Sequence, residues 1–248
     1  MADMLSLRGV EKTFATGAQA LGGLDLDVRE GEFLSLLGPS GCGKSTALRM
    51  IAGLSQPTRG SLEWRAGRPE IGFVFQDAVL MPWANVFDNV WLPLRLTGQS
   101  RAQSAARIEA ALDLVGLTGF AKAYPRELSG GMKMRVSIAR AMVLRPALLL
   151  MDEPFAALDE ITRLKLNNDL LRLKQELGAT VVFVTHSVFE SVYLSSRIAV
   201  FSARPGHVVA DIEVDAPLAR DDAFRLSPLY AQACKEASDA LHKAMGEA

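Results

Sequence analysis

The spacing of hydrophobic and polar residues divides this chain into short strands and amphipathic helices. Residues 24–28 alternate apolar and polar side chains, which predicts an antiparallel strand with one solvated face. Residues 33–37 and 147–152 are predicted to be buried strands, because each is a short and mostly apolar run. Further strands are predicted at 61–64, 71–76, 181–185, 198–201 and 207–214, and helices at 85–96, 101–115, 130–144, 161–177 and 187–195.

The order of these elements predicts how the chain is organised. Strands alternating with helices are typical of a mostly parallel sheet, and the N-terminal alternation adds a small antiparallel sheet. Helices over about 77–145 interrupt the pattern and predict an inserted helical subdomain. We therefore expect one domain over 1–215, with its core in 1–76 and 146–215, followed by a tail at 216–248 that ends in a helix.

Composition narrows the classes of function. Hydrophobic residues make up 49% of the chain and the formal net charge is −1, with no basic block, so nucleic acid is not expected as a partner. Cys42 and Cys234 provide no disulfide framework, and a reducing compartment is the simplest location. We find neither a signal peptide nor an apolar run of about 18 residues, so work at a membrane would need another chain.

The stretch 38–46 carries the most specific chemistry. It fits the phosphate-loop pattern G-x-x-x-x-G-K-[ST] and lies between a predicted buried strand and a predicted helix, which is the context that the motif requires. Backbone N–H groups and the helix N-terminus would hold a polyphosphate, Lys44 would reach the β- and γ-phosphates, and Ser45 would ligate Mg²⁺. Cys42, beside Lys44, is expected to be an alkylation-sensitive thiol that ATP protects, and a small loop residue with an ordinary thiol is the alternative. The predicted ATP-binding residues are Gly38, Pro39, Ser40, Gly41, Cys42, Gly43, Lys44, Ser45 and Thr46.

Two carboxylates follow the apolar run 148–151. An acidic turn would explain Asp152 and Glu153 alone, but beside a phosphate loop they suit Mg²⁺ phosphate chemistry. Asp152 would hold Mg²⁺ through water, and Glu153 would act as general base toward an attacking water. Ser129, Gly130 and Gly131 open another helix and predict a second anion site, which is not expected to reach the phosphate loop of its own chain.

These motifs resemble, in order and spacing, those of an ABC transporter ATP-binding cassette. The resemblance covers about residues 4–215, and its elements are the phosphate loop, Gln76, Leu128–Gly131, Asp152–Glu153, Ala157–Asp159 and His186. The resemblance implies an α/β phosphate-loop (RecA-like) fold with an N-terminal antiparallel β subdomain and an inserted α-helical subdomain. It also implies an ATP hydrolase that forms head-to-tail dimers, with ATP and Mg²⁺ between the two copies.

The resemblance assigns further residues. Ser129–Gly131 of one copy would contact the γ-phosphate on the other, and Asp159 would lie at the dimer seam. Gln76 would link the Mg²⁺ site to a membrane partner, and His186 would contact the γ-phosphate and position water. Phe14 occupies the place of the aromatic residue that stacks on adenine, although a core aromatic is the alternative.

Met132 departs from the family pattern, in which glutamine is usual. A methionine at this position resembles the sequences of the nitrate, taurine and aliphatic-sulfonate importer branch. The stretches 76–86 and 202–206 resemble the same branch. Residues 77–91 would form the groove for a permease helix. The predicted permease contacts, which could instead pack inside the protein, are Leu80, Met81, Trp83 and Val86.

The expected function is therefore the ATPase of an importer at the cytoplasmic face of the inner membrane. Its partners would be a second copy of the chain, integral-membrane permease subunits and, indirectly, a solute-binding protein. The lone cassette favours import over export, and a soluble cluster-assembly ATPase stays open as an alternative. The sequence does not indicate which solute is transported, because an ATP-binding cassette does not touch the solute.

Overall fold

The computed structural model describes residues 2–215 and 220–246 of the chain. The chain forms two compact units. The first unit combines Met1–Arg68 with Ala179–Ala248, and the second is Pro69–Gly178.

The N-terminal strands of the first unit form an antiparallel sheet in the order β2-β1-β4. Its strands are β1 (Asp3–Thr13), β2 (Gln19–Arg29) and β4 (Arg59–Trp64). β1 and β2 are longer than the predicted strand because register shifts break the apolar alternation, as between the pairs Leu7–Leu26 and Val10–Leu24.

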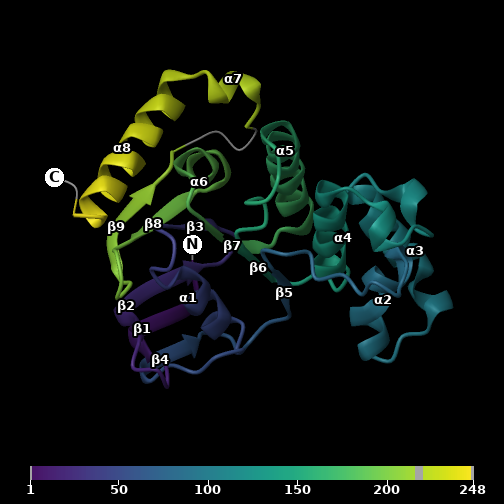
Figure 1. Ribbon diagram of the computed structural model, residues 1–248, viewed down its shortest axis with the longest axis horizontal. Helices are drawn as coiled ribbons and strands as arrows, with labels where there is room; N and C mark the ends of the chain where they lie inside the picture. Colours follow the sequence, from purple (N-terminus) through teal and green to yellow (C-terminus); the bar gives the residue numbers. More distant parts are fainter. Residues whose placement is uncertain (1, 216–219, 247–248) are drawn as a thin grey trace. The chain divides into compact units, whose positions relative to one another are not determined.

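The first unit also contains parallel strands that are buried along their whole length. β3 (Phe33–Leu37) lies between β7 (Thr180–Thr185) and β8 (Arg197–Phe201) and runs parallel to both. β9 (Val208–Glu213) pairs antiparallel with β8. Figure 1 shows α6 (Val188–Leu194) and α8 (Pro228–Ala244) on one face of these strands and α1 (Lys44–Ile51) on the other. Coverage of both faces explains the continuous apolar runs.

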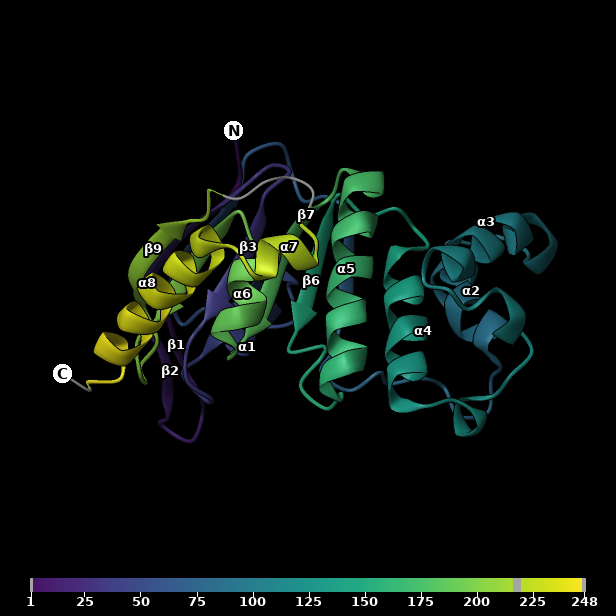
Figure 2. The same ribbon diagram turned by 90° about the horizontal axis from the view of Figure 1, so that it is seen from above.

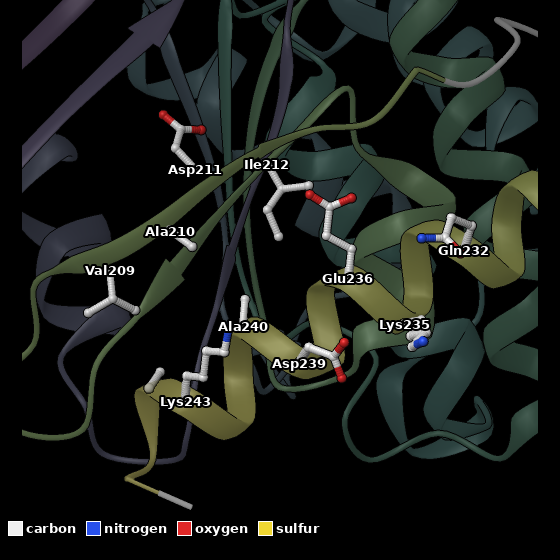
Figure 3. A pocket seen from close by; sticks show the side chains of 11 residues that line it. Val209, Ala210, Asp211, Ile212, Gln232, Lys235, Glu236, Asp239, Ala240 and Lys243 are labelled. Atoms are coloured by element: carbon white, nitrogen blue, oxygen red, sulfur yellow. The ribbon is translucent and has the colours of Figure 1, made fainter. Parts of the chain in front are cut away.

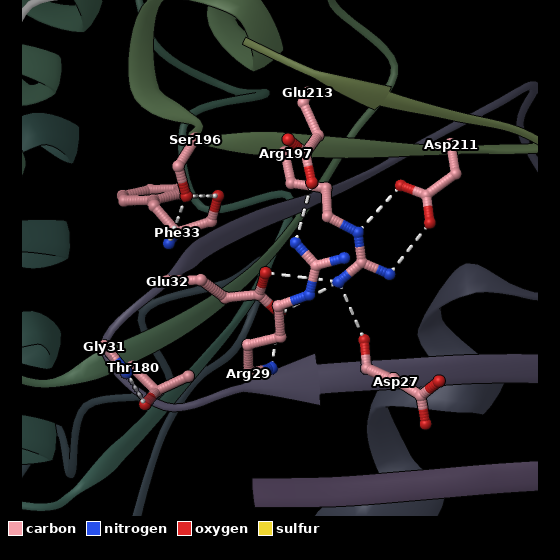
Figure 4. Close-up of polar contacts among 10 residues, drawn as sticks. All are labelled: Asp27, Arg29, Gly31, Glu32, Phe33, Thr180, Ser196, Arg197, Asp211 and Glu213. Carbon is pink, nitrogen blue, oxygen red and sulfur yellow. Dashed lines mark hydrogen bonds and ion pairs between the residues drawn. The ribbon is translucent and has the colours of Figure 1, made fainter. Parts of the chain in front are cut away.

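A buried arginine ties these elements together (Figure 4). Arg197 on β8 donates two hydrogen bonds to Asp211 on β9, at 2.7 and 2.9 Å. It also donates to both carboxylate oxygens of Glu32 at 3.2 Å, and to the Asp27 carbonyl on β2 at 3.0 Å. Burial raises the pKa of Glu32, although the Arg29 N–H and Arg197 oppose the shift. Such a network is costly to break, because one lost partner leaves a buried charge uncompensated.

The described C-terminal part of the chain is helical. α7 (Asp222–Arg225) precedes α8, which lies along β8 and β9. Between α8 and β9 lies a groove of about 770 Å³ that is lined by both acidic and basic side chains, among them Asp211, Glu236 and Lys243 (Figure 3). Residues 216–219 and 247–248 of the predicted tail lie outside the described residues.

The second unit consists of two parallel strands and a set of helices. β5 (Ile71–Val74) pairs with β6 (Leu148–Asp152). Figure 2 shows α4 beside α5, which agrees with the 2.7 Å ion pair between Arg135 and Asp169. The helices are α2 (Val86–Leu96), α3 (Arg101–Leu114), α4 (Gly130–Met142) and α5 (Glu160–Leu177), with short 3-10 turns η1 (Thr118–Phe120) and η2 (Pro125–Glu127).

The predicted fold class is confirmed. The chain has parallel strands covered by helices, a separate antiparallel sheet near the N-terminus, and helices inserted between β5 and β6. None of the helices in the described part of the chain combines the length and hydrophobicity that crossing a membrane requires.

Candidate nucleotide site

The phosphate loop of the first unit connects β3 to α1. The loop begins at Gly38, directly after the buried strand, and Gly43 stands at the N-cap of α1. No side chain caps α1, and its first turn contains no acidic residue. Every other α-helix of the described residues has an Asn, Ser or Asp side chain at its N-cap that accepts a backbone N–H. The start of α1 therefore keeps its positive dipole end and N–H donors for an anion.

Lys44 points back into this loop. Its ammonium group donates hydrogen bonds of 2.8 Å to the carbonyls of both Gly38 and Pro39, and the residue is only 3% exposed. The charge is thus held inside the curve of the loop, where a phosphate would replace neutral carbonyl partners with a charge-assisted contact. Ser45 follows in the first turn of α1 and is partly buried.

Two glycines let neighbouring backbone approach the loop closely. Gly43 has φ +111°, and a methyl group there would lie 2.5 Å from the Ala20 carbonyl oxygen. A methyl group on Gly206 would lie 2.0 Å from the Cys42 carbonyl oxygen. Gly206 also donates to Ala20 at 2.9 Å and accepts from Gly22 at 3.1 Å. The sequence does not predict this support, although the stretch 202–206 resembles the importer branch.

Cys42 is a buried residue of the phosphate loop. Its side chain is 1% exposed, and its Sγ lies 3.7 Å from Lys44 Nζ. The sulfur packs inside the loop, where reagents in solution do not reach it without local opening. Alkylation of Cys42 and its protection by ATP stay a prediction, which requires local opening of the loop.

The first unit also contains Phe14 and His186. Phe14 lies between β1 and β2, is 43% exposed, and has the Lys12 ammonium 5.7 Å from its ring centroid. This exposure does not fit the core aromatic that was the alternative explanation. His186 is exposed and lies between the end of β7 and the start of α6.

In the second unit, the two predicted carboxylates differ in their surroundings. Asp152 is the last residue of β6 and is 6% exposed. Glu153 follows with φ +44°, a conformation that is uncommon for a residue with a side chain. Such strain, at a cost of order 1–3 kcal/mol, is concentrated at functional sites. The sequence did not indicate this strain.

Gln76 and Asp159 both lie at the ends of elements. Gln76 is exposed and follows β5. Asp159 is exposed and caps α5 by accepting the Thr162 N–H at 2.9 Å. Hydrogen bonds from the backbone and side chain of Thr162 hold the pKa of Asp159 below its usual value.

The serine–glycine stretch opens α4 in the way that the sequence predicts. Ser129 is exposed and caps the helix by accepting the Met132 N–H at 3.3 Å. A methyl group on Gly131 would lie 2.7 Å from the Thr162 side chain on α5, so a larger residue here would require that side chain to move. Met132 is partly buried and contributes its backbone N–H to the cap.

The predicted permease-contact stretch is only partly exposed. Trp83 is 77% exposed, and Leu80 and Met81 are half-buried. Val86 is fully buried as the first residue of α2, so its predicted role as a partner contact is wrong. Val79, which was not predicted, is 61% exposed.

Comparisons with known proteins identify the chain. The model of the ABC transporter family matches residues 21–156. This chain belongs to the ABC transporter family. It is 42% identical to an aliphatic sulfonates import ATP-binding protein of Pseudomonas syringae pv. tomato, over 97% of this chain and 99% of that protein. It is 47% identical to a nitrate import ATP-binding protein of Synechococcus elongatus, over 81% of this chain but 32% of that protein.

A solved ATP-binding cassette has the same fold. It is a dimeric post-hydrolysis structure bound to ADP and Pi, with a TM-score of 0.77 and 34% identity, covering 86% of this chain and 100% of that one. Together with the family match, this confirms the resemblance stated from the sequence. The chain is an ABC-type ATPase, and ATP is its nucleotide.

Each unit of this ABC ATPase contains an oxygen donor of the kind that Mg²⁺ prefers. The described residues contain no cluster of three or more His, Cys, Asp or Glu side chains that could form a metal cage by themselves. Mg²⁺ typically takes one or two protein oxygens and completes its shell with substrate phosphates and water. The hydroxyl of Ser45 and the carboxylate of Asp152 are donors of this kind.

Proposed function

We propose that this chain is the ATP-hydrolysing subunit of an importer for a small solute. The observation that carries the proposal is the relative that spans nearly the whole chain and is an import subunit for aliphatic sulfonates. The solute would be similar to a sulfonate, taurine or nitrate. The chain would lie at the cytoplasmic face of the inner membrane, bound to separate permease subunits that receive solute from a binding protein.

The phosphate loop would bind the nucleotide. Lys44 would exchange the carbonyls of Gly38 and Pro39 for the β- and γ-phosphates, and the open N-terminus of α1 would supply N–H donors. Phe14, which is partly exposed, would stack on adenine.

The reaction would be attack of water on the γ-phosphorus with departure of ADP. Glu153 would accept the proton of that water, and His186 would hold the water and the γ-phosphate. Ser45, Asp152 and Gln76 would hold Mg²⁺, which supplies charge stabilisation for the phosphates. The strained backbone at Glu153 supports a functional role for this carboxylate.

A second copy of the chain would complete the site. Ser129, Gly130 and Gly131 of that copy would meet the γ-phosphate with the N-terminus of α4, while Asp159 would lie at the seam. Hydrolysis would then depend on dimer closure, which couples ATP use to a conformational cycle. The dimeric cassette structure is a precedent among relatives.

The stretch 77–91 of the helical insertion would receive a permease helix. Trp83 and Val79 are exposed, and Leu80 and Met81 are partly so, which suits an apolar contact with a partner helix. Val86 is excluded from this set by its burial.

Replacement of Glu153 by glutamine tests the proposal. Glu153→Gln should bind Mg-ATP with unchanged affinity, lower the hydrolysis rate by about 10²–10⁴-fold and accumulate a dimer, measured by phosphate release and light scattering. Glu160→Gln, an exposed carboxylate in the first turn of α5, is the matched control and should hydrolyse normally. A Glu153→Gln chain that turns over at the unmodified rate would contradict the assigned base.

A further inference from the structure

His186 lies at the junction between β7 and α6, and its position depends on that helix. Thr185, the last residue of β7, donates from its hydroxyl to the Glu190 carboxylate on α6 at 2.7 Å. The Ser187 N–H donates to the same Thr185 hydroxyl at 3.0 Å. The backbone on both sides of His186 is therefore tied to the first turn of α6.

This helix is too short to hold its place alone. It has seven residues, whereas isolated helices shorter than about 12–15 residues are marginal in water. Its geometry must come from the elements that pack on it. α8 packs on α6 in the first unit, as Figure 1 shows.

The C-terminal end of α6 is held by one arginine from the tail. Arg220 donates to the carbonyls of Val192 at 3.2 Å and Ser195 at 2.8 Å, and it also bonds the Tyr193 carbonyl. The Tyr193 hydroxyl donates back to the Arg220 carbonyl at 2.8 Å. A cation suits the last carbonyls of a helix, which have no partners within it. Burial lowers the pKa of Arg220 to about 10, so the side chain stays charged at neutral pH.

The N-terminal half of α6 is held by α8. The Tyr230 hydroxyl donates to the Phe189 carbonyl at 3.0 Å. Phe224 packs between the rings of Tyr230 and Tyr193, with centroids 5.4 and 6.2 Å away. The guanidinium carbon of Arg225 lies 3.4 Å from the Tyr193 ring centroid. These contacts fix the tail along the whole of α6.

We propose that residues 220–244 form a clamp on α6 that positions His186, with Arg220 and Tyr230 as its positioning residues. The proposal rests on the role of His186 in the proposed function. The clamp acts on the rate of hydrolysis and not on nucleotide affinity, because Arg220 and Tyr230 donate their hydrogen bonds to carbonyls of α6 and of its C-cap residue, Ser195. The tail is thus part of the catalytic apparatus, although it touches no reacting atom.

Two variants of the full chain test the clamp. Arg220→Ala should lower kcat for ATP about tenfold and leave KM within about twofold. Tyr230→Phe, which removes one hydroxyl and keeps the ring packing, should lower kcat by about threefold. Arg220→Lys should recover part of the loss, and Lys235→Ala on an exposed position of α8 is the control that should behave as the unmodified chain.

A double-variant cycle separates positioning from general destabilisation. When His186 is already alanine, Arg220→Ala should cause no further loss of kcat. An equal loss in both backgrounds, an unchanged kcat in folded Arg220→Ala, or a rise in KM alone would overturn the clamp. If Arg220→Ala does not fold, the same kcat values are measured for Tyr230→Phe with and without His186→Ala.

Hydrogen exchange of the α6 amides tests, independently of catalysis, whether the clamp holds α6. Exchange over 188–194 should accelerate in Arg220→Ala, and unchanged exchange would overturn the proposal. An unmodified chain without ATP hydrolysis would instead refute the proposed function, and the exchange result would still decide whether the tail holds α6.

Discussion

The guanidinium of Arg140 donates a 2.9 Å hydrogen bond to the carbonyl of Val79, whose backbone has φ +42°. A second bond of 2.9 Å goes to the Ala78 carbonyl. Arg140 is near the end of α4, the helix that Ser129 caps at its start. One helix thus joins the proposed trans anion site to the stretch proposed to meet the permease. A β-branched residue in this conformation is strained, and the two hydrogen bonds of Arg140 help to hold it.

Loss of this arginine should loosen the stretch selectively. Hydrogen bonds from a charged group contribute about 1.5–3 kcal/mol, so Arg140→Ala should speed hydrogen exchange of the amides in 77–80 by about 10–150-fold. Arg140→Lys should give a smaller effect, because an ammonium does not reproduce the planar fork. Exchange measured by mass spectrometry on the isolated chain checks both.

Arg135→Lys is the matched control for Arg140. It lies on the same helix but bonds Val115 and Asp169, away from the 77–80 stretch. Its exchange effect should stay near those partners. Uniform acceleration across the second unit in Arg140→Ala would show that the arginine only supports the fold.

The parts of the fold that local patterns determine were predictable. Continuous apolar runs identified β3 and β6, because the burial of both faces of a strand is visible within its own few residues. Contacts between distant segments were not predictable. Three features depend on which segments meet in space. They are the close approach of Gly206 to Cys42, the burial of Val86, and the hydrogen bonds of Arg220 to the end of α6.

Lys44→Ala should weaken binding of Mg-ATP by about 10–150-fold, because it removes a charge-assisted contact with the phosphates worth about 1.5–3 kcal/mol. Titration calorimetry measures the affinity. Arg49→Ala, at an exposed position on the same helix, should bind as the unmodified chain does. Equal affinities for the Lys44 variant and this control would remove the lysine from the nucleotide site.

Gly206→Ala should also weaken ATP binding, although Gly206 lies outside the motif. The added methyl would lie 2.0 Å from the Cys42 carbonyl oxygen, so the phosphate loop or the 202–207 segment must shift. Such overpacking costs about 1–3 kcal/mol, shared between stability and loop geometry. Calorimetric affinity and thermal unfolding together check the prediction.

Gly119→Ala controls for the general effect of replacing glycine, since a methyl there meets nothing within 4 Å and its φ is not positive. This variant should keep both its affinity and its melting temperature. Gly206→Ala with normal affinity would mean that the phosphate loop does not depend on this contact.

Asp27 and Glu32 should give the folding stability opposite dependences on pH. Burial alone would raise the pKa of Asp27, but hydrogen bonds from Ser6 and Arg8, both 2.6 Å long, bring it below its ordinary 3.8. Its contribution to stability is therefore present above that value and is lost as pH falls toward the folded pKa. Burial raises the pKa of Glu32 above its ordinary 4.5. Its contribution is present below 4.5 and is lost as pH rises through the folded pKa.

Urea unfolding of Asp27→Asn and Glu32→Gln over a pH series measures the two contributions. The unfolding free energy of the unmodified chain should exceed that of Asp27→Asn by an amount that grows as pH rises from below 3.8. The excess of its unfolding free energy over that of Glu32→Gln should shrink as pH rises above 4.5. The excess should stay positive, because in the variant Arg197 has one buried charged partner fewer. Parallel pH curves for the two variants would contradict the opposite shifts. The reason to expect a difference is physical: Asp27 is partly exposed and hydrogen-bonded as an anion, whereas Glu32 is removed from water almost completely.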